Sequence, residues 1–133
     1  MNNAKKYLPP PFMLSKVINP IIIKLGLLSV LNVKGRKSGK EFKIPVTPLE
    51  YKGEIFLVAP RGETQWARNL WVHPIGSLTT KGKTRNFTAT VITGNTQTEV
   101  VKLYQQKVPA VKAQFDSLPD PKDHPVFKLK FKE

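Results

Sequence analysis

Residues 34–40 (KGRKSGK) combine the residue types that bind phosphate groups. The segment places four basic side chains around two glycines and one serine hydroxyl. Glycine lets backbone N–H groups approach an anion closely, and Arg and Lys add charge-assisted hydrogen bonds to phosphate oxygens. The GxxxxGK[ST] spacing of a nucleotide-binding Walker loop is absent. The segment therefore predicts an anion site, and an ordinary basic hairpin turn is the alternative.

A second segment, residues 59–71 (APRGETQWARNLW), predicts an anion site beside an aromatic surface. Trp66 and Leu70 are four residues apart, as on one face of a short helix. The first amide groups of a helix favour anions, and Arg61 and Arg68 add positive charge. Tryptophan rings offer faces for a planar ring system, although Trp66 is more typical of a core anchor.

Conventional catalytic residues are not evident in this chain. It has no cysteine, which excludes thiol nucleophiles, disulfides and zinc sites built on Cys, and which suits a reducing cytoplasm. Its two histidines, His73 and His124, are each followed by proline and do not form a metal-binding pattern. No Ser-His-Asp spacing and no carboxylate pair stands out. If the protein is an enzyme, a cofactor is expected to carry the chemistry.

The net charge of +13 is extreme for 133 residues. It arises from 22 basic and 9 acidic side chains, and it predicts affinity for polyanions. Three partners fit that charge: nucleic acid, an anionic membrane surface, or a cofactor with phosphate and carboxylate groups. A basic surface that only promotes solubility is the fourth interpretation.

The length predicts one domain. We expect residues 1–11 to form a flexible arm and residues 12–133 to form the domain. Residues 12–31 are apolar, but Lys16 and Pro20 interrupt them, so they are too polar for a membrane span. They predict a helix broken or kinked at Pro20, with its apolar face on the core or, alternatively, on a membrane surface.

Alternating apolar residues and turn residues predict a mostly antiparallel β protein with helices around it, an α+β barrel or roll. Thr64 is the expected N-cap of a short helix that ends at His73-Pro74. Residues 96–99 (TQTE) have the form of a capping box that begins an amphipathic helix, with residues 109–125 rich in loops. Strands are expected over residues 28–34, 40–51, 54–59, 76–81, 84–93 and 126–131, with tight turns at Lys52-Gly53 and near Gly82, and Val100, Tyr104 and Val108 are expected on one helical stripe.

In their order and spacing, residues 28–93 resemble the deazaflavin (F420)-dependent nitroreductase and quinone reductase family of F420-binding split β-barrels. The resemblance is carried by the GRKSG turn after the first strand and by the Pro48-Leu49 pair. It continues with residues 59–62 (APRG) and with a helix that bears Trp66 and Asn69-Leu70. It implies an antiparallel split β-barrel, like the FMN-binding split barrels, with peripheral helices.

The resemblance also implies coenzyme F420 as the cofactor and hydride transfer from reduced F420 to a quinone-like or other electron-poor acceptor. The phosphate would meet Arg36, Lys37 and Ser38. Pro45, Val46 and Thr47 would lie along the ring system. The cofactor groove would be lined by Ala59, Pro60, Arg61, Gly62, Trp66, Arg68, Asn69 and Leu70.

The sequence departs from nitroreductase-type members of that family. Those have a longer Gly-Gly-x-Pro insertion and a Trp-Tyr pair, whereas residues 61–65 form a shorter segment here and Ala67 follows Trp66. The tyrosines that handle substrate in those relatives have no counterpart. Activity on nitroimidazole prodrugs is therefore not expected, and no catalytic residue is assigned.

Two other functions fit the residues. Related split barrels bind FMN, which has a phosphate but no glutamate tail. The other function is non-enzymatic binding, either as a carrier of cofactor or lipid or as a nucleic-acid-binding barrel. The nucleic-acid alternative rests on Lys81, Lys83 and Arg85, which lie near Phe87 in the sequence. The expected partners are a small-molecule acceptor, a second copy of the chain as in the family, and peripherally a membrane. The expected location is the cytoplasm, with contact at the inner membrane surface.

Overall fold

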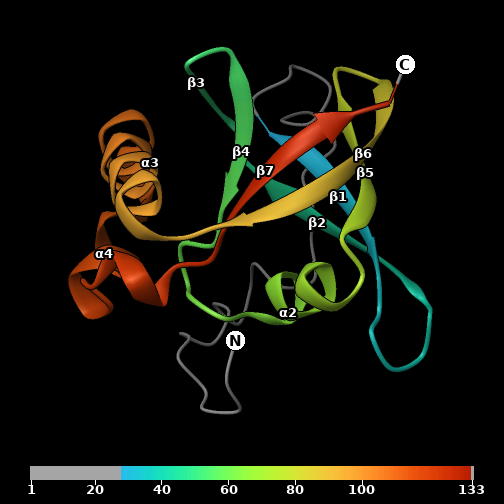
Figure 1. The fold of residues 1–133 in the computed structure, drawn as a ribbon, viewed down its shortest axis with the longest axis horizontal. Helices are drawn as coiled ribbons and strands as arrows, with labels where there is room; N and C mark the ends of the chain where they lie inside the picture. The colour runs from blue at the N-terminus through green and yellow to red at the C-terminus, as the bar shows by residue number, and fades with distance from the viewer. Residues whose placement is uncertain (1–27, 133) are drawn as a thin grey trace.

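The computed structural model describes residues 28–132, in which seven strands form one antiparallel sheet of order β2-β1-β5-β6-β7-β4-β3 (Figure 1). The expected arm and residues 12–27 of the expected N-terminal helix lie outside the described residues. Ser29–Leu31 belong to β1, which confirms the strand predicted over residues 28–34 and shows that the helix predicted as far as residue 31 is wrong at its end. The strands are β1 Ser29–Lys34, β2 Glu41–Val46, β3 Leu49–Tyr51, β4 Glu54–Val58, β5 Ile75–Thr80, β6 Lys83–Ile92 and β7 Val126–Phe131.

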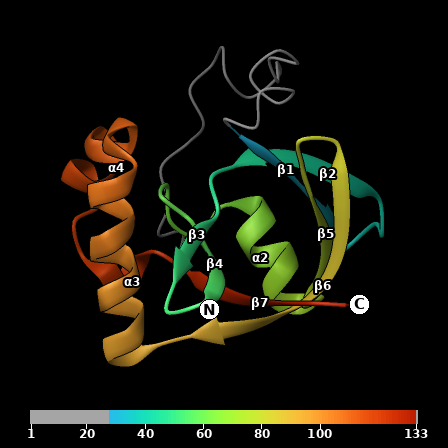
Figure 2. The same cartoon turned by 90° about the horizontal axis from the view of Figure 1, so that it is seen from above.

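The sheet curls because its two edge strands are neighbours in sequence. β2 and β3 stand first and last in the sheet order, yet only Thr47 and Pro48 separate them. So short a link spans at most about 11 Å, which draws the two edges together. Figure 2 shows the resulting half-closed barrel. This confirms the predicted split barrel of the α+β class.

The single strand predicted over residues 40–51 is wrong in one respect, since it is two strands on opposite edges. Pro48 has no N–H to donate to a sheet, and the chain leaves one edge there and joins the other. Pro45 is tolerated in β2 because that strand is at an edge of the sheet. The tight turns are confirmed: Lys52-Gly53 and Lys81-Gly82 all have positive φ angles, between 51° and 79°.

Helix α2 (Gln65–Val72) lies against the curled sheet, and α3 (Gly94–Lys107) and α4 (Lys112–Ser117) pack on the outside of β4 (Figure 2). The helices cover two hydrophobic clusters, one around α2 and one shared by α3 and α4. Buried residues around α2 are Leu31, Val33, Leu57, Ala59, Trp66, Ala67, Leu70, Leu78, Phe87, Phe127 and Leu129. Buried residues around α3 and α4 are Leu49, Phe56, Val58, Val100, Val101, Tyr104, Val111, Phe115 and Val126.

In the C-terminal third, the predicted start of the long helix and the predicted loop over residues 109–125 are corrected. Helix α3 begins at Gly94, two residues before the predicted capping box, and its N-cap is Thr93. The predicted loop over residues 109–125 contains α4 and two short 3₁₀ helices, η1 (Pro109–Val111) and η2 (Pro121–Asp123). Their prolines stand at the first helical position, where a missing N–H costs no hydrogen bond. The predicted stripe of α3 is confirmed, since Val100 and Tyr104 are buried and Val108 packs against them.

Within residues 28–132, no helix has the length and apolar character needed to cross a bilayer.

Candidate functional site

The basic segment forms a compact turn between β1 and β2. Gly35 donates its N–H to the Lys40 carbonyl at 2.7 Å, and Gly39 donates to the Gly35 carbonyl at 3.0 Å. Gly39 has a φ of 73°, a conformation that glycine adopts without strain. A Cβ on Gly35 would stand 2.8 Å from the Phe42 ring, so the turn packs closely on that ring. The prediction of a glycine turn here is confirmed.

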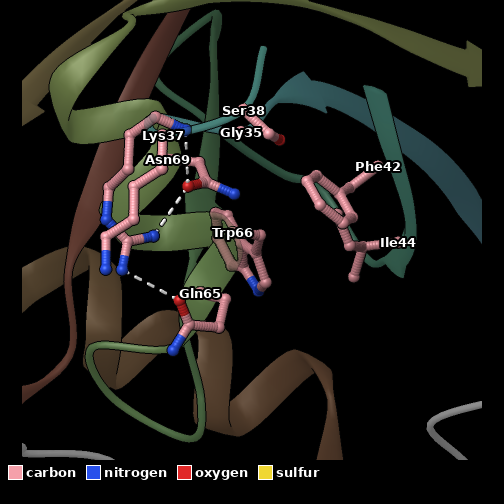
Figure 3. Close-up of a pocket in the computed structure, with 9 residues that line it drawn as sticks. Gly35, Lys37, Ser38, Phe42, Ile44, Gln65, Trp66 and Asn69 are labelled. Carbon is pink, nitrogen blue, oxygen red and sulfur yellow. Dashed lines mark hydrogen bonds between the residues drawn. The ribbon is translucent and has the colours of Figure 1, made fainter. Parts of the chain in front are cut away.

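Arg36 joins this turn to α2. The Oδ1 atom of Asn69 accepts two hydrogen bonds from Arg36, one from its backbone N–H at 3.1 Å and one from Nη1 at 2.7 Å. The Oε1 atom of Gln65 accepts a third from Nη2 at 2.9 Å (Figure 3). Asn69 is buried, so its two bonds to Arg36 are partly shielded from water, whereas the bond to Gln65 is exposed. The structure thus brings together the two segments that the sequence singled out separately.

A cavity of about 290 Å³ lies between the turn and α2. One side is basic and polar, with Arg36, Lys37 and Ser38, and the other is apolar. In Figure 3, Phe42 and Ile44 of β2 stand across from Trp66 of α2. The complete lining is Gly35, Arg36, Lys37, Ser38, Phe42, Ile44, Gln65, Trp66 and Asn69.

Trp66 is a core anchor, and its contact with a cofactor ring stays a prediction. It is 7% exposed and packs on Phe127 with ring centroids 6.1 Å apart, as a core anchor does. It also lines the cavity. Because its ring is fixed by the core, the aromatic wall that it offers to a ligand is rigid.

The loop between β4 and α2 carries buried polar atoms that lack partners. Nη1 of Arg61 and Oγ1 of Thr64 are buried without a hydrogen-bond partner among the residues that the structure describes. Burial lowers the pKa of Arg61 from its ordinary value. Thr64 is at the N-cap of α2, as predicted, but its side chain makes no capping bond. Arg68 is directed to Glu63, donating Nε to the carbonyl at 3.0 Å and facing the carboxylate at 3.6 Å.

Five of the sequence-predicted site residues line the cavity and nine do not. Ala59 and Leu70 are fully buried and serve the core. The contacts of all fourteen with a cofactor stay predictions. Those that line the cavity are Arg36, Lys37, Ser38, Trp66 and Asn69, and those that lie outside its lining are Pro45, Val46, Thr47, Ala59, Pro60, Arg61, Gly62, Arg68 and Leu70.

Gly35, Phe42, Ile44 and Gln65 line the cavity although they were not among the predicted site residues. The spacing of residues within the strand and within the helix could have identified three of them. Phe42 and Ile44 are two apart in a strand and share one face, and Gln65 is four residues before Asn69 on one helical face.

Residues 21–119, well over half of the chain, match the family model for F420H(2)-dependent quinone reductase. The chain belongs to this family. The membership makes the protein an F420-dependent reductase with coenzyme F420 as its cofactor, which confirms the predicted function, enzyme class and cofactor. No curated protein matches the chain.

Solved structures similar to this F420H(2)-dependent quinone reductase family member share its fold. The F420-H2 dependent reductase FDR-A has a TM-score of 0.60 and 24% identity, over 77% of this chain and 93% of that one. HutZ, the heme storage protein from Vibrio cholerae, has a TM-score of 0.62 and 15% identity, over 86% and 90%. A protein from Listeria innocua described as a pyridoxamine 5'-phosphate oxidase has a TM-score of 0.58 and 13% identity, over 86% of this chain and 90% of that one. The family match, and not these structures, therefore identifies the cofactor.

Proposed function

We propose that the cavity between the 35–39 turn and α2 holds coenzyme F420, and that the enzyme passes hydride from reduced F420 to a quinone-like acceptor. The observation that carries the proposal is the triple hydrogen bonding of Arg36 by Asn69 and Gln65 at the basic side of a cavity with an aromatic wall. A phosphate-bearing ring cofactor needs both features next to each other.

The polar side of the cavity fits the phosphate of the cofactor. Arg36 uses two of its five guanidinium N–H groups on Asn69 and Gln65, which leaves three to donate. The Ser38 hydroxyl accepts from the Lys40 N–H at 3.2 Å, so its own proton remains available for a phosphate oxygen. Lys37 is exposed beside them and can meet the acidic tail. Preorganised donors of this kind bind without a large ordering cost.

The apolar side fits the ring system and the acceptor. When bound, reduced F420 supplies a hydride, and a quinone that takes up this hydride and a proton becomes a hydroquinone. Phe42, Ile44 and Trp66 contribute flat and apolar surface that orients planar rings and excludes water. No acid or base residue is assigned, since transfer to an electron-poor acceptor depends mainly on orientation.

A turnover assay tests this function. Reduced F420 is mixed with the enzyme and menadione, and the reappearance of oxidised F420 is followed by absorbance. We expect enzyme-dependent oxidation of reduced F420 that requires the quinone, with little activity when NADPH replaces it. Quinone reduction with NADPH and none with reduced F420 would contradict the proposal.

We infer that two copies of the chain associate through an apolar corner at the end of α2. Trp71, Val72 and Ile75 are 39%, 52% and 48% exposed. A solved structure described as a domain-swapped dimer matches with a TM-score of 0.59 and 23% identity, over 77% of this chain and 79% of that one.

Light scattering tests this association. The wild type should have twice the monomer mass, and Trp71→Ser should lower the measured mass. A monomer that sediments with anionic vesicles would instead support the predicted peripheral membrane contact.

A further inference from the structure

His124 is fully buried and both of its ring nitrogens face carbonyl oxygens. Nδ1 is 2.9 Å from the carbonyl oxygen of Ala59, and Nε2 contacts the carbonyl oxygen of Leu118. The ring stacks on Phe115, with centroids 4.1 Å apart and planes inclined by 25°. The backbone around it is also fixed, since Gln97 donates Nε2 to the His124 carbonyl at 3.0 Å.

This arrangement determines how many nitrogens of the His124 ring must carry a proton. A carbonyl oxygen only accepts hydrogen bonds, and a neutral imidazole has one N–H to donate. Both contacts of His124 are hydrogen bonds only when both nitrogens carry protons. In the neutral ring, one nitrogen lone pair faces a carbonyl lone pair, and one of the two contacts is lost.

The elements that surround His124 carry charged groups, and none of these forms an ion pair with the ring in the described part of the chain. Two of these groups are occupied with each other, because Lys112 and Asp116 form a 2.7 Å pair. The groups are Lys112 and Asp116 on α4, Asp120, Lys122 and Asp123 at η2, Glu99, Lys102 and Tyr104 on α3, Arg61 and Glu63 after β4, and Glu54 and Lys128 on β4 and β7.

The Ala59 carbonyl connects His124 to the cavity. The same oxygen accepts the Gly62 N–H at 3.1 Å, and the Gly62 carbonyl accepts the Thr64 N–H at 2.7 Å. Thr64 is the N-cap of α2, and the next residue, Gln65, bonds to Arg36. A continuous series of hydrogen bonds thus runs from His124 to the start of the helix that lines the cavity.

We propose that His124 is a positioning residue for the F420 site. In its doubly protonated form it ties the loop of residues 59–64 to the segment after α4, and so fixes α2 and its contacts with Arg36. The inference rests on the proposed function, because it assumes that F420 occupies the cavity. Removal of these two contacts frees the loop from the segment after α4, so F420 affinity falls.

The first test compares F420 binding by fluorescence for wild type, His124→Phe and His73→Gln. Phenylalanine keeps the stacked ring and removes both donors, and His73 is the exposed second histidine of the chain, which makes it the matched control. At about pH 6, we expect His124→Phe to raise the Kd for F420 roughly tenfold, and His73→Gln to leave it near that of wild type.

The second test does not need the His124 variant to fold. In His73→Gln, His124 is the remaining histidine, and its ring nitrogens are observed by ¹⁵N NMR at about pH 6. Two protonated nitrogens support the proposal, and one unprotonated nitrogen overturns it. An unchanged Kd for F420 in His124→Phe also overturns it, while leaving the F420 site intact. Absence of F420 binding in wild type would instead contradict the proposed function, and with it the role of His124 in that function.

Discussion

Arg36 stands where the 35–39 turn meets α2 and holds that junction with three hydrogen bonds. Replacing it by alanine removes the anchored guanidinium that we assign to the phosphate. Hydrogen bonds of charged groups contribute about 1.5–3 kcal/mol, so Arg36→Ala should weaken F420 binding by roughly 10- to 100-fold. Fluorescence titration measures the effect. Lys112→Ala removes the same charge at an exposed position outside the cavity lining, and its Kd should stay near that of wild type.

We propose that Asn69 acts on F420 binding through Arg36, and a double-mutant cycle can separate this from direct contact. Asn69→Ala leaves Arg36 without the oxygen that accepts both its backbone N–H and its Nη1. We expect it to weaken F420 binding by roughly tenfold, with a coupling to Arg36→Ala of at least about 0.5 kcal/mol. Additive effects of the two substitutions would contradict the positioning role of Asn69.

Among individual residues, the sequence could predict those site residues that are close together in the chain. Arg36, Lys37 and Ser38 share one short segment, and their types alone indicate an anion site. The bond between Arg36 and Asn69 joins residues 33 positions apart, and no local pattern contains it. The unpaired atoms of Arg61 and Thr64 were likewise beyond prediction, because they depend on how the loop is buried.

Among the elements, the pairing of β1 and β5 depends on Gly76. A Cβ at this position would lie 2.6 Å from the Asn32 carbonyl oxygen and 3.0 Å from Cζ of Phe87. Backbone and a fully buried ring cannot move aside easily, so Gly76→Ala should lower the free energy of unfolding by about 1–3 kcal/mol. Urea unfolding measures this, with Ser77→Ala as the neighbouring control. An alanine variant as stable as wild type would show that this approach is looser than the structure indicates.

Elements with strong local signals could be predicted, and their arrangement could not. Both Lys-Gly hairpin turns and the β7 strand follow from turn residues and alternation. The position of β7 between β6 and β4 depends on long-range pairing, which the sequence does not reveal. The prolines at residues 109 and 121 were interpreted as loop markers, although proline also begins helices.

For the molecule as a whole, Tyr104 links stability to alkaline pH. Burial raises its pKa from 10.0 to about 12. Between these values the unfolded chain loses the phenolic proton while the folded chain keeps it, so stability falls as the pH rises above 10. The urea midpoint of wild type should therefore fall more between about pH 9 and pH 11 than that of Tyr104→Phe. A fall of equal size in both would show that other groups cause it, and Tyr51→Phe serves as the control.

The measurement that tests the account most directly is a fluorescence titration of the protein with F420 and, separately, with FMN. It is made for wild type, for Lys112→Ala and for the double variant Arg36→Ala/Lys37→Ala. We predict that wild type and Lys112→Ala bind F420 with a similar Kd, more tightly than FMN, and that the double variant loses most of this affinity. Preference for FMN, or unchanged F420 affinity in the double variant, would contradict the assignment of the cavity beside the 35–39 turn as the F420 site.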